Sequence, residues 1–151
     1  MKSLPGFHLP EYRSLVLSLV DHGYELAPVS AMRRPRGKRT VFLRHDIDFS
    51  PEAALPMARL EAELGCVATY YFLHTGPYDL TGGTEGDALQ EIASMGHEIG
   101  LHYDLMTYPD QEMEEHLKAE CRQLAALSGV DINTITMHQP HQGGGDPFRE
   151  H

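Results

Sequence analysis

The stretch Thr40-Val41-Phe42-Leu43-Arg44-His45-Asp46-Ile47-Asp48 decides the fold, because it passes directly from apolar to polar residues. Its first four residues include β-branched and aromatic side chains, which are typical of a strand. Ser50-Pro51-Glu52 follows, and this is typical of a helix start, since Ser is a favoured N-cap and Pro suits the first helical position. The stretch therefore predicts a strand that leads into a helix, with acidic and imidazole groups at the junction.

The same alternation of strand and helix continues on both sides of this stretch. Further strands are expected at 66–73, 98–103 and 133–137, and helices at 11–22, 51–64, 87–95 and 110–128. The Gly-rich segment 77–86, including Gly82 and Gly83, is expected to be a flexible loop. Strands that alternate with helices predict an α/β fold of parallel βαβ units with right-handed connections. We expect an N-terminal helix and linker at 1–39, and the α/β fold at 40–151.

Composition narrows the class of protein. The 151 residues carry a formal charge of −10 and are 41% hydrophobic, which fits a globular chain and argues against a basic nucleic-acid groove. No apolar run is long enough for a membrane span, and no apolar h-region of a signal peptide is seen. With only two cysteines, a cytoplasmic location is expected. Ten histidines direct attention to metal chemistry.

The polar residues with the strongest functional signal follow three of the expected strands. Active sites of parallel α/β folds lie at the carboxyl ends of the strands, where Asp46, Asp48, His102 and His138 are expected. Alternate strand residues point the same way, so Asp46 and Asp48 share one face. Together Asp48, His102 and His138 supply one carboxylate and two imidazoles, the ligand number of a catalytic zinc site. The competing interpretation is a solvated loop in which an Asp caps a helix.

Other residues near these strand ends have simpler interpretations. His97 faces away from His102 and is expected to be a packing or surface residue, whereas Gly100 is expected to open space beside His102. His138 has its own alternative, a turn into the loop at Pro140 with a hydrogen bond to backbone. His141 is an alternative ligand.

Three segments together resemble the polysaccharide deacetylase family, carbohydrate esterase family 4 of the NodB type. They are 42–48, Ala68-Thr69-Tyr70-Tyr71-Phe72, and Gly96-His97-Glu98-Ile99-Gly100-Leu101-His102, and the resemblance extends over roughly residues 40–140. It implies a parallel-strand (β/α) barrel and metal-dependent removal of an acetyl group from an N-acetylated sugar. By this resemblance Asp46 matches the catalytic base, Asp48 the metal-binding Asp, and His102 the first metal-binding His.

The chain departs from the family pattern in two ways. The family's second metal-binding His usually comes four residues after the first, where this chain has Met106, a soft thioether. His138 is our candidate replacement, and Asp104 is the second choice. A closed barrel also takes roughly 200–250 residues, so we expect only the N-terminal part of the barrel here, with the C-terminal part missing.

We therefore expect a metal-dependent hydrolase that removes an acetyl group from an N-acetylated or O-acetylated sugar or glycan precursor. The expected cofactor is a divalent metal, zinc first, with cobalt or another divalent ion as the alternative. The expected partner is a carbohydrate substrate, without nucleic acid or a membrane span. Two alternatives stay open: a non-catalytic deacetylase-like carbohydrate-binding protein, and a flavodoxin-like, Mg²⁺-binding receiver-type domain.

Overall fold

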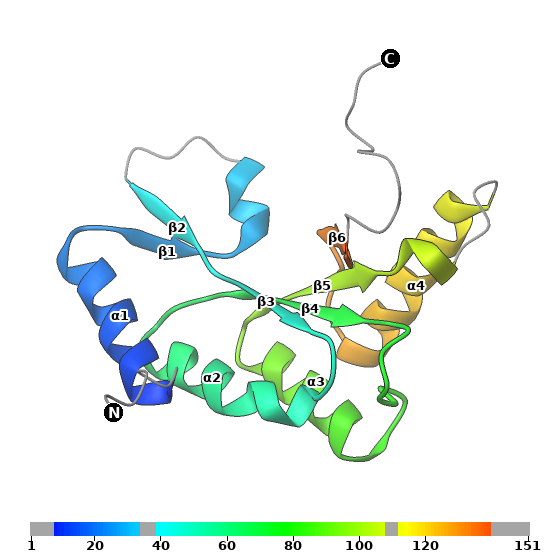
Figure 1. The fold of residues 1–151 in the computed structure, drawn as a ribbon, viewed down its shortest axis with the longest axis horizontal. Helices are drawn as coiled ribbons and strands as arrows, with labels where there is room; N and C mark the ends of the chain where they lie inside the picture. Colours follow the sequence, from blue (N-terminus) through cyan, green and yellow to red (C-terminus); the bar gives the residue numbers. More distant parts are fainter. Residues whose placement is uncertain (1–7, 34–38, 108–111, 140–151) are drawn as a thin grey trace, which may run out of the picture.

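The computed structural model describes residues 8–33, 39–107 and 112–139 (Figure 1). Strands and helices alternate along the chain as expected. In chain order the elements are α1 (Leu9–Asp21), β1 (Glu25–Ala27), the 3₁₀ helix η1 (Val29–Arg33), β2 (Thr40–Phe42), β3 (Arg44–Ile47), α2 (Pro51–Glu63), β4 (Thr69–Leu73), α3 (Gly83–Ser94), β5 (Glu98–Tyr103), the 3₁₀ helix η2 (Leu105–Thr107), α4 (Met113–Ser128) and β6 (Ile135–Met137).

The central sheet has the strand order β3-β4-β5-β6, and all of its pairings are parallel. Helix α2 packs beside α3 and α3 beside α4, and these helices lie on one side of the sheet (Figure 1). A sequential order with helices on one face is the arrangement of a barrel wall, whereas a flavodoxin-like sheet reverses its order and carries helices on both faces. The flavodoxin-like alternative therefore does not fit. The described residues form a curled half-barrel sheet, and they do not form a closed barrel.

The strand expected over 40–48 is divided at Leu43, because its two halves have different partners. β2 pairs with β1, and β3 pairs with β4. Leu43 lies between β2 and β3, where the chain passes from the small sheet to the central sheet. Its N–H donates to the Ala27 carbonyl at 2.9 Å, and its carbonyl accepts from the Thr69 N–H at 3.0 Å. The expectation of one helix and a linker for 1–39 omitted β1 and η1.

Helix η1 is attached to the amino end of the central sheet. The Val29 N–H donates to Thr69 Oγ1 at 2.8 Å, and the Ser30 N–H donates to Glu98 Oε1 at 3.2 Å. Glu98 Oε1 also accepts from the hydroxyls of Thr69 at 2.6 Å and Thr134 at 3.2 Å. This carboxylate therefore joins η1, β4 and the start of β6.

One expected helix start is confirmed, and one expected loop is corrected. Ser50 caps α2 as predicted, since its Oγ accepts from the Ala53 N–H at 3.1 Å. The prediction of a flexible loop through Gly82 and Gly83 was partly wrong, because α3 begins at Gly83. Although glycine has weak helix propensity, the first turn is closed by the Gly86 N–H bond to the Gly82 carbonyl at 3.2 Å, and Thr84 Oγ1 donates to Glu52 at 2.7 Å.

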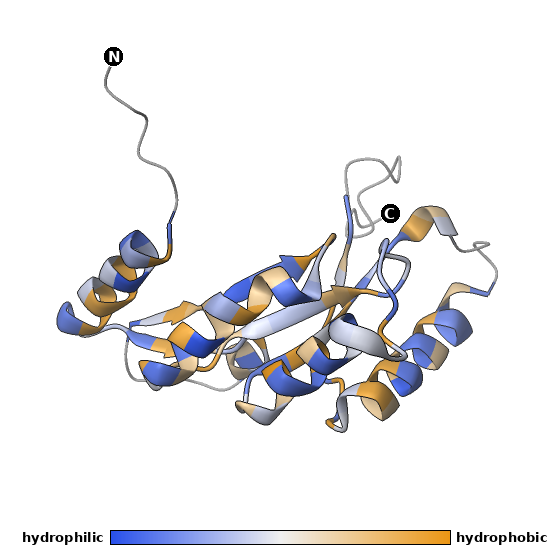
Figure 2. Ribbon diagram, turned by 90° about the horizontal axis from the view of Figure 1, so that it is seen from below, coloured by the Kyte–Doolittle hydropathy of each residue, from blue (hydrophilic) through white to orange (hydrophobic). Residues whose placement is uncertain are grey.

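The core lies between the central sheet and the helices. Tyr70, Phe72, Ile99 and Leu101 of β4 and β5 are fully buried there. Figure 2 shows hydrophobic and hydrophilic residues alternating around the helices that cover this face, as amphipathic helices require. No helix in the described part of the chain is long and apolar enough to cross a membrane.

His97 is a buried packing residue, as expected. Its Nδ1 accepts from the Ala68 N–H at 3.2 Å, and its Nε2–H donates to the Ala58 carbonyl at 2.9 Å. Both nitrogens are satisfied by backbone, so the ring links α2 to the start of β4.

Gly100 does not open space beside His102, and that expectation was wrong. The aromatic ring of Tyr71 fills the room above it: a Cβ added at Gly100 would lie 2.4 Å from two ring carbons of Tyr71 and 3.1 Å from Thr134 Oγ1.

We therefore expect Gly100→Ala to lower the free energy of unfolding by roughly 1–3 kcal/mol, because overpacking forces a buried ring to move. Urea denaturation measures this, with Gly82→Ala as the control, since a Cβ at Gly82 meets nothing within 4 Å. Equal stability of the two variants would contradict the expected clash.

Candidate metal centre

Three side chains converge at the carboxyl end of the central sheet. Asp48 follows β3, His102 lies near the end of β5, and His138 directly follows β6. Asp48 Oδ1 lies 3.4 Å from His102 Nε2 and 3.5 Å from His138 Nδ1, and the two nitrogens are 3.1 Å apart. These residues are the group of His, Cys, Asp and Glu side chains that can hold a metal ion within the described chain. The sequence predicted all three.

The spacing of these donors fits a small divalent cation. Zinc takes tetrahedral ligands at bond lengths of roughly 2.0–2.2 Å, so two ligand atoms are about 3.3 Å apart. The three donor separations of 3.1, 3.4 and 3.5 Å lie close to this value. One carboxylate with two imidazoles suits zinc or another borderline ion, and suits Mg²⁺ poorly, since Mg²⁺ prefers oxygen ligands.

In the neutral ring of His102, the Nε2 atom carries a lone pair that can bind a metal ion. Its Nδ1–H donates to the Thr136 carbonyl at 3.2 Å, so Nε2 carries no proton in the neutral ring. Metal-binding histidines usually have their second nitrogen bound to a carbonyl or carboxylate in this manner. The ring is also only 3% exposed, which limits its movement.

The buried oxygen of Asp48 is a second observation that fits a bound cation. Its Oδ1 is buried and makes no hydrogen bond to any residue that the structure describes. A buried carboxylate oxygen without a partner is costly, and a bound cation is one way to stabilise it. The donor set and this unpartnered oxygen both fit a divalent ion.

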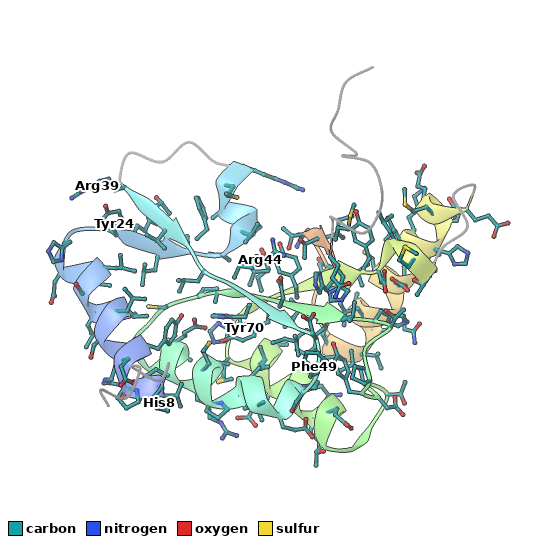
Figure 3. All side chains as sticks on the ribbon, viewed as in Figure 1. His8, Tyr24, Arg39, Arg44, Phe49 and Tyr70 are labelled. Atoms are coloured by element: carbon teal, nitrogen blue, oxygen red, sulfur yellow. The ribbon has the colours of Figure 1, made fainter. Side chains whose placement is uncertain are left out.

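Asp46 lies beside the three donors and has a different partner. Its Oδ2 is 4.0 Å from His102 Nε2, and its two oxygens accept from Arg44 Nε and a terminal Arg44 nitrogen, each at 2.8 Å. This bidentate pair raises the pKa of Arg44 and fixes the plane of the carboxylate. Figure 3 shows Arg44 on the side of the sheet away from α2 and α3, and Tyr70 on the helix side.

Arg44 was missed by the sequence analysis, although a signal for it was present. It precedes Asp46 by two residues on the strand, and residues two apart share a face. The guanidinium also lies over the Tyr71 ring, 5.1 Å from its centroid, so the ring supports the pair from the sheet side.

The other candidate ligands do not join this group. Asp104 Oδ1 accepts from the Met106 N–H at 2.9 Å, so this carboxylate caps η2, and Met106 is 71% exposed. His141 lies outside the described residues. His138 bonds to Tyr103 through its backbone N–H at 2.7 Å, while its ring faces His102. Gln139 then has φ of 45°, a left-handed conformation that turns the chain after His138.

Comparison of the chain with protein-family models, with curated proteins and with solved structures found no match.

Proposed function

We propose that this chain is a metal-dependent hydrolase of the polysaccharide deacetylase type, which removes an acetyl group from an N-acetylated or O-acetylated sugar or glycan precursor. The observation that carries the proposal is the convergence of Asp48, His102 and His138 beside Asp46 at the carboxyl end of a half-barrel sheet. The sequence resemblance in 42–48 and 96–102 supports it, because Asp46, Asp48 and His102 lie in those segments.

Asp48, His102 and His138 would hold the ion, and zinc fits the donor set best, with cobalt as the alternative. When bound, the ion supplies Lewis-acid polarisation of the acetyl carbonyl and lowers the pKa of a nearby water. Three protein ligands leave a position open for water or substrate.

Asp46 is the proposed general base. Its side chain is 34% exposed, so water and substrate can reach it, and its distance from His102 puts it beside the proposed ion site. Arg44 holds the plane of the carboxylate through two hydrogen bonds, so that Asp46 can accept a proton from water. The proton can then pass from Asp46 to the departing amine or hydroxyl, which leaves acetate and the deacetylated sugar.

Metal titration of the 151-residue chain tests the site directly. We expect wild type to bind one cobalt or zinc ion, and His138→Ala to bind it at least tenfold more weakly, because one of three donors is removed. Calorimetry measures the affinity, and the visible absorption of bound cobalt reports its coordination. His116→Ala, which changes an exposed histidine on α4, is the control. Unchanged affinity in His138→Ala would remove this residue from the ligand set.

Acetate release from N-acetylglucosamine oligomers, with zinc present, tests the activity. Release that depends on both zinc and Asp46 is the expected result. Metal binding without release from N-acetylated or O-acetylated sugars would contradict the hydrolase proposal and favour the non-catalytic carbohydrate-binding alternative.

A further inference from the structure

The loop after β4 carries a tyrosine, Tyr78, whose hydroxyl bonds to the ends of β3 and β4. The Tyr78 hydroxyl donates to the Ile47 carbonyl at 2.6 Å and accepts from the Leu73 N–H at 2.7 Å. Ile47 and Phe72 form the last paired position of β3 and β4. A single hydroxyl therefore connects β3 and β4 by hydrogen bonds at the point where their backbone pairing ends.

Both tied positions adjoin a proposed metal ligand. The Ile47 carbonyl belongs to the peptide group that leads into Asp48, so its orientation sets the direction in which Asp48 leaves the strand. Leu73 lies opposite His102 in the register of β4 and β5. The hydroxyl therefore contacts positions next to a carboxylate and an imidazole that come from different strands.

The surroundings of Tyr78 hold the ring and keep its hydroxyl protonated. A Cβ at Gly76 would lie 2.7 Å from Tyr78 Cε1 and 2.9 Å from the Leu73 carbonyl oxygen, so only glycine allows this close approach. Burial raises the pKa of Tyr78 and the nearby Asp48 charge adds to this, although the Leu73 N–H opposes it. The phenol can therefore donate to Ile47 at neutral pH.

We propose that Tyr78 is a positioning residue of the metal centre, which fixes Asp48 and His102 at the separation that the ion requires by tying the ends of β3 and β4. The inference rests on the proposed metal site. It assigns the loop of Gly76 and Tyr78 a role in metal affinity. Without the hydroxyl, the Ile47 and Leu73 groups lose a shared partner and the Asp48 peptide is free to rotate.

Cobalt titration of Tyr78→Phe, with Tyr70→Phe as the matched control, tests this role. Tyr70→Phe also removes a hydroxyl with a hydrogen bond, 2.6 Å from Glu61, but on the helix side of the sheet. We expect Tyr78→Phe to weaken cobalt affinity about tenfold or more and to alter the visible spectrum, as loss of an outer-shell partner does. Tyr70→Phe should lower the melting temperature and leave cobalt affinity unchanged.

Gly76→Ala provides a second variant, because it keeps the hydroxyl and displaces the ring. Weaker cobalt binding by this variant would support the inference even if Tyr78→Phe does not fold. Wild-type affinity in folded Tyr78→Phe, or equal loss in Tyr78→Phe and Tyr70→Phe, would overturn it while the metal site stands. Absence of cobalt binding in wild type would overturn the metal site itself and this inference with it.

Discussion

Asp48→Ala is expected to bind neither zinc nor cobalt, whereas Asp46→Asn is expected to bind the ion as wild type does and to lose turnover. Asp48 supplies the buried oxygen that faces both imidazoles. Asp46 is partly exposed and paired with Arg44, so it is placed to accept a proton and is not needed to hold the ion. Loss of a general base typically costs 10²–10⁴-fold in rate, and a loss of roughly that size is expected for Asp46→Asn.

Calorimetric titration and acetate release, measured on the same preparations, separate these two roles. Asp104→Asn is the matched control, since this carboxylate also follows a strand end but caps η2. Its amide oxygen can still accept from the Met106 N–H, so metal affinity and turnover should both stay at the wild-type level. Equal loss of metal binding in Asp46→Asn and Asp48→Ala would contradict the division into base and ligand.

The convergence of Asp48, His102 and His138 could be predicted from sequence by two local rules. Strand periodicity places Asp46 and Asp48 on one face, and parallel topology brings strand ends to one edge of the sheet. Neither rule requires knowledge of side-chain packing. The structure accordingly brings together Asp48, His102 and His138, with Asp46 beside them.

Features that depend on contacts between distant segments escaped prediction. β1 is three residues long and shows no alternation, and it becomes a strand only because β2 lies beside it. Gly100 looked like open space in the sequence, although the ring that fills it belongs to β4. The two bonds of the Tyr78 hydroxyl reach residues 5 and 31 positions away. Local patterns contain no information about such partners.

Glu61 is the clearest example of this limit. It lies in the run Leu60-Glu61-Ala62-Glu63 of α2, where two glutamates look equally suited to the surface. Glu61 is fully buried, whereas the Glu63 side chain is 64% exposed. The difference arises because three donors from three other elements meet at Glu61. Its carboxylate accepts from Tyr12 of α1, from His45 Nε2 at 2.7 Å, and from Tyr70 at 2.6 Å.

Removal of this buried carboxylate is expected to have the largest effect on stability. Glu61→Ala leaves three buried or half-buried donors without their acceptor, and each buried donor left unsatisfied typically costs about 1–3 kcal/mol. Glu63→Ala is the matched control: it removes an exposed pair with Arg13 at 3.1 Å, and such surface pairs contribute roughly 0–1 kcal/mol. Urea unfolding of both variants at neutral pH measures the difference.

The pH dependence of this difference follows from the pKa of Glu61. Burial by itself opposes ionisation, but the hydrogen bond and charge of His45, with the hydrogen bonds of Tyr12 and Tyr70, outweigh it and lower the pKa. A carboxylate with a lowered pKa stabilises the fold above its ordinary value of about 4.3, and this contribution is lost as the pH falls through the lowered value.

The stability gap between wild type and Glu61→Ala should therefore be widest near neutral pH and should narrow below about pH 4. Unfolding curves recorded between pH 7 and pH 3 give the gap at each pH, and Glu63→Ala corrects for acid effects on the rest of the surface. A gap that stays constant over this range would mean that the Glu61 carboxylate stabilises the fold by packing alone. If Glu61→Ala lost no more stability than Glu63→Ala, then Tyr12, His45 and Tyr70 would have found other partners. In that case α1 would not depend on Glu61 for its attachment to α2 and β4.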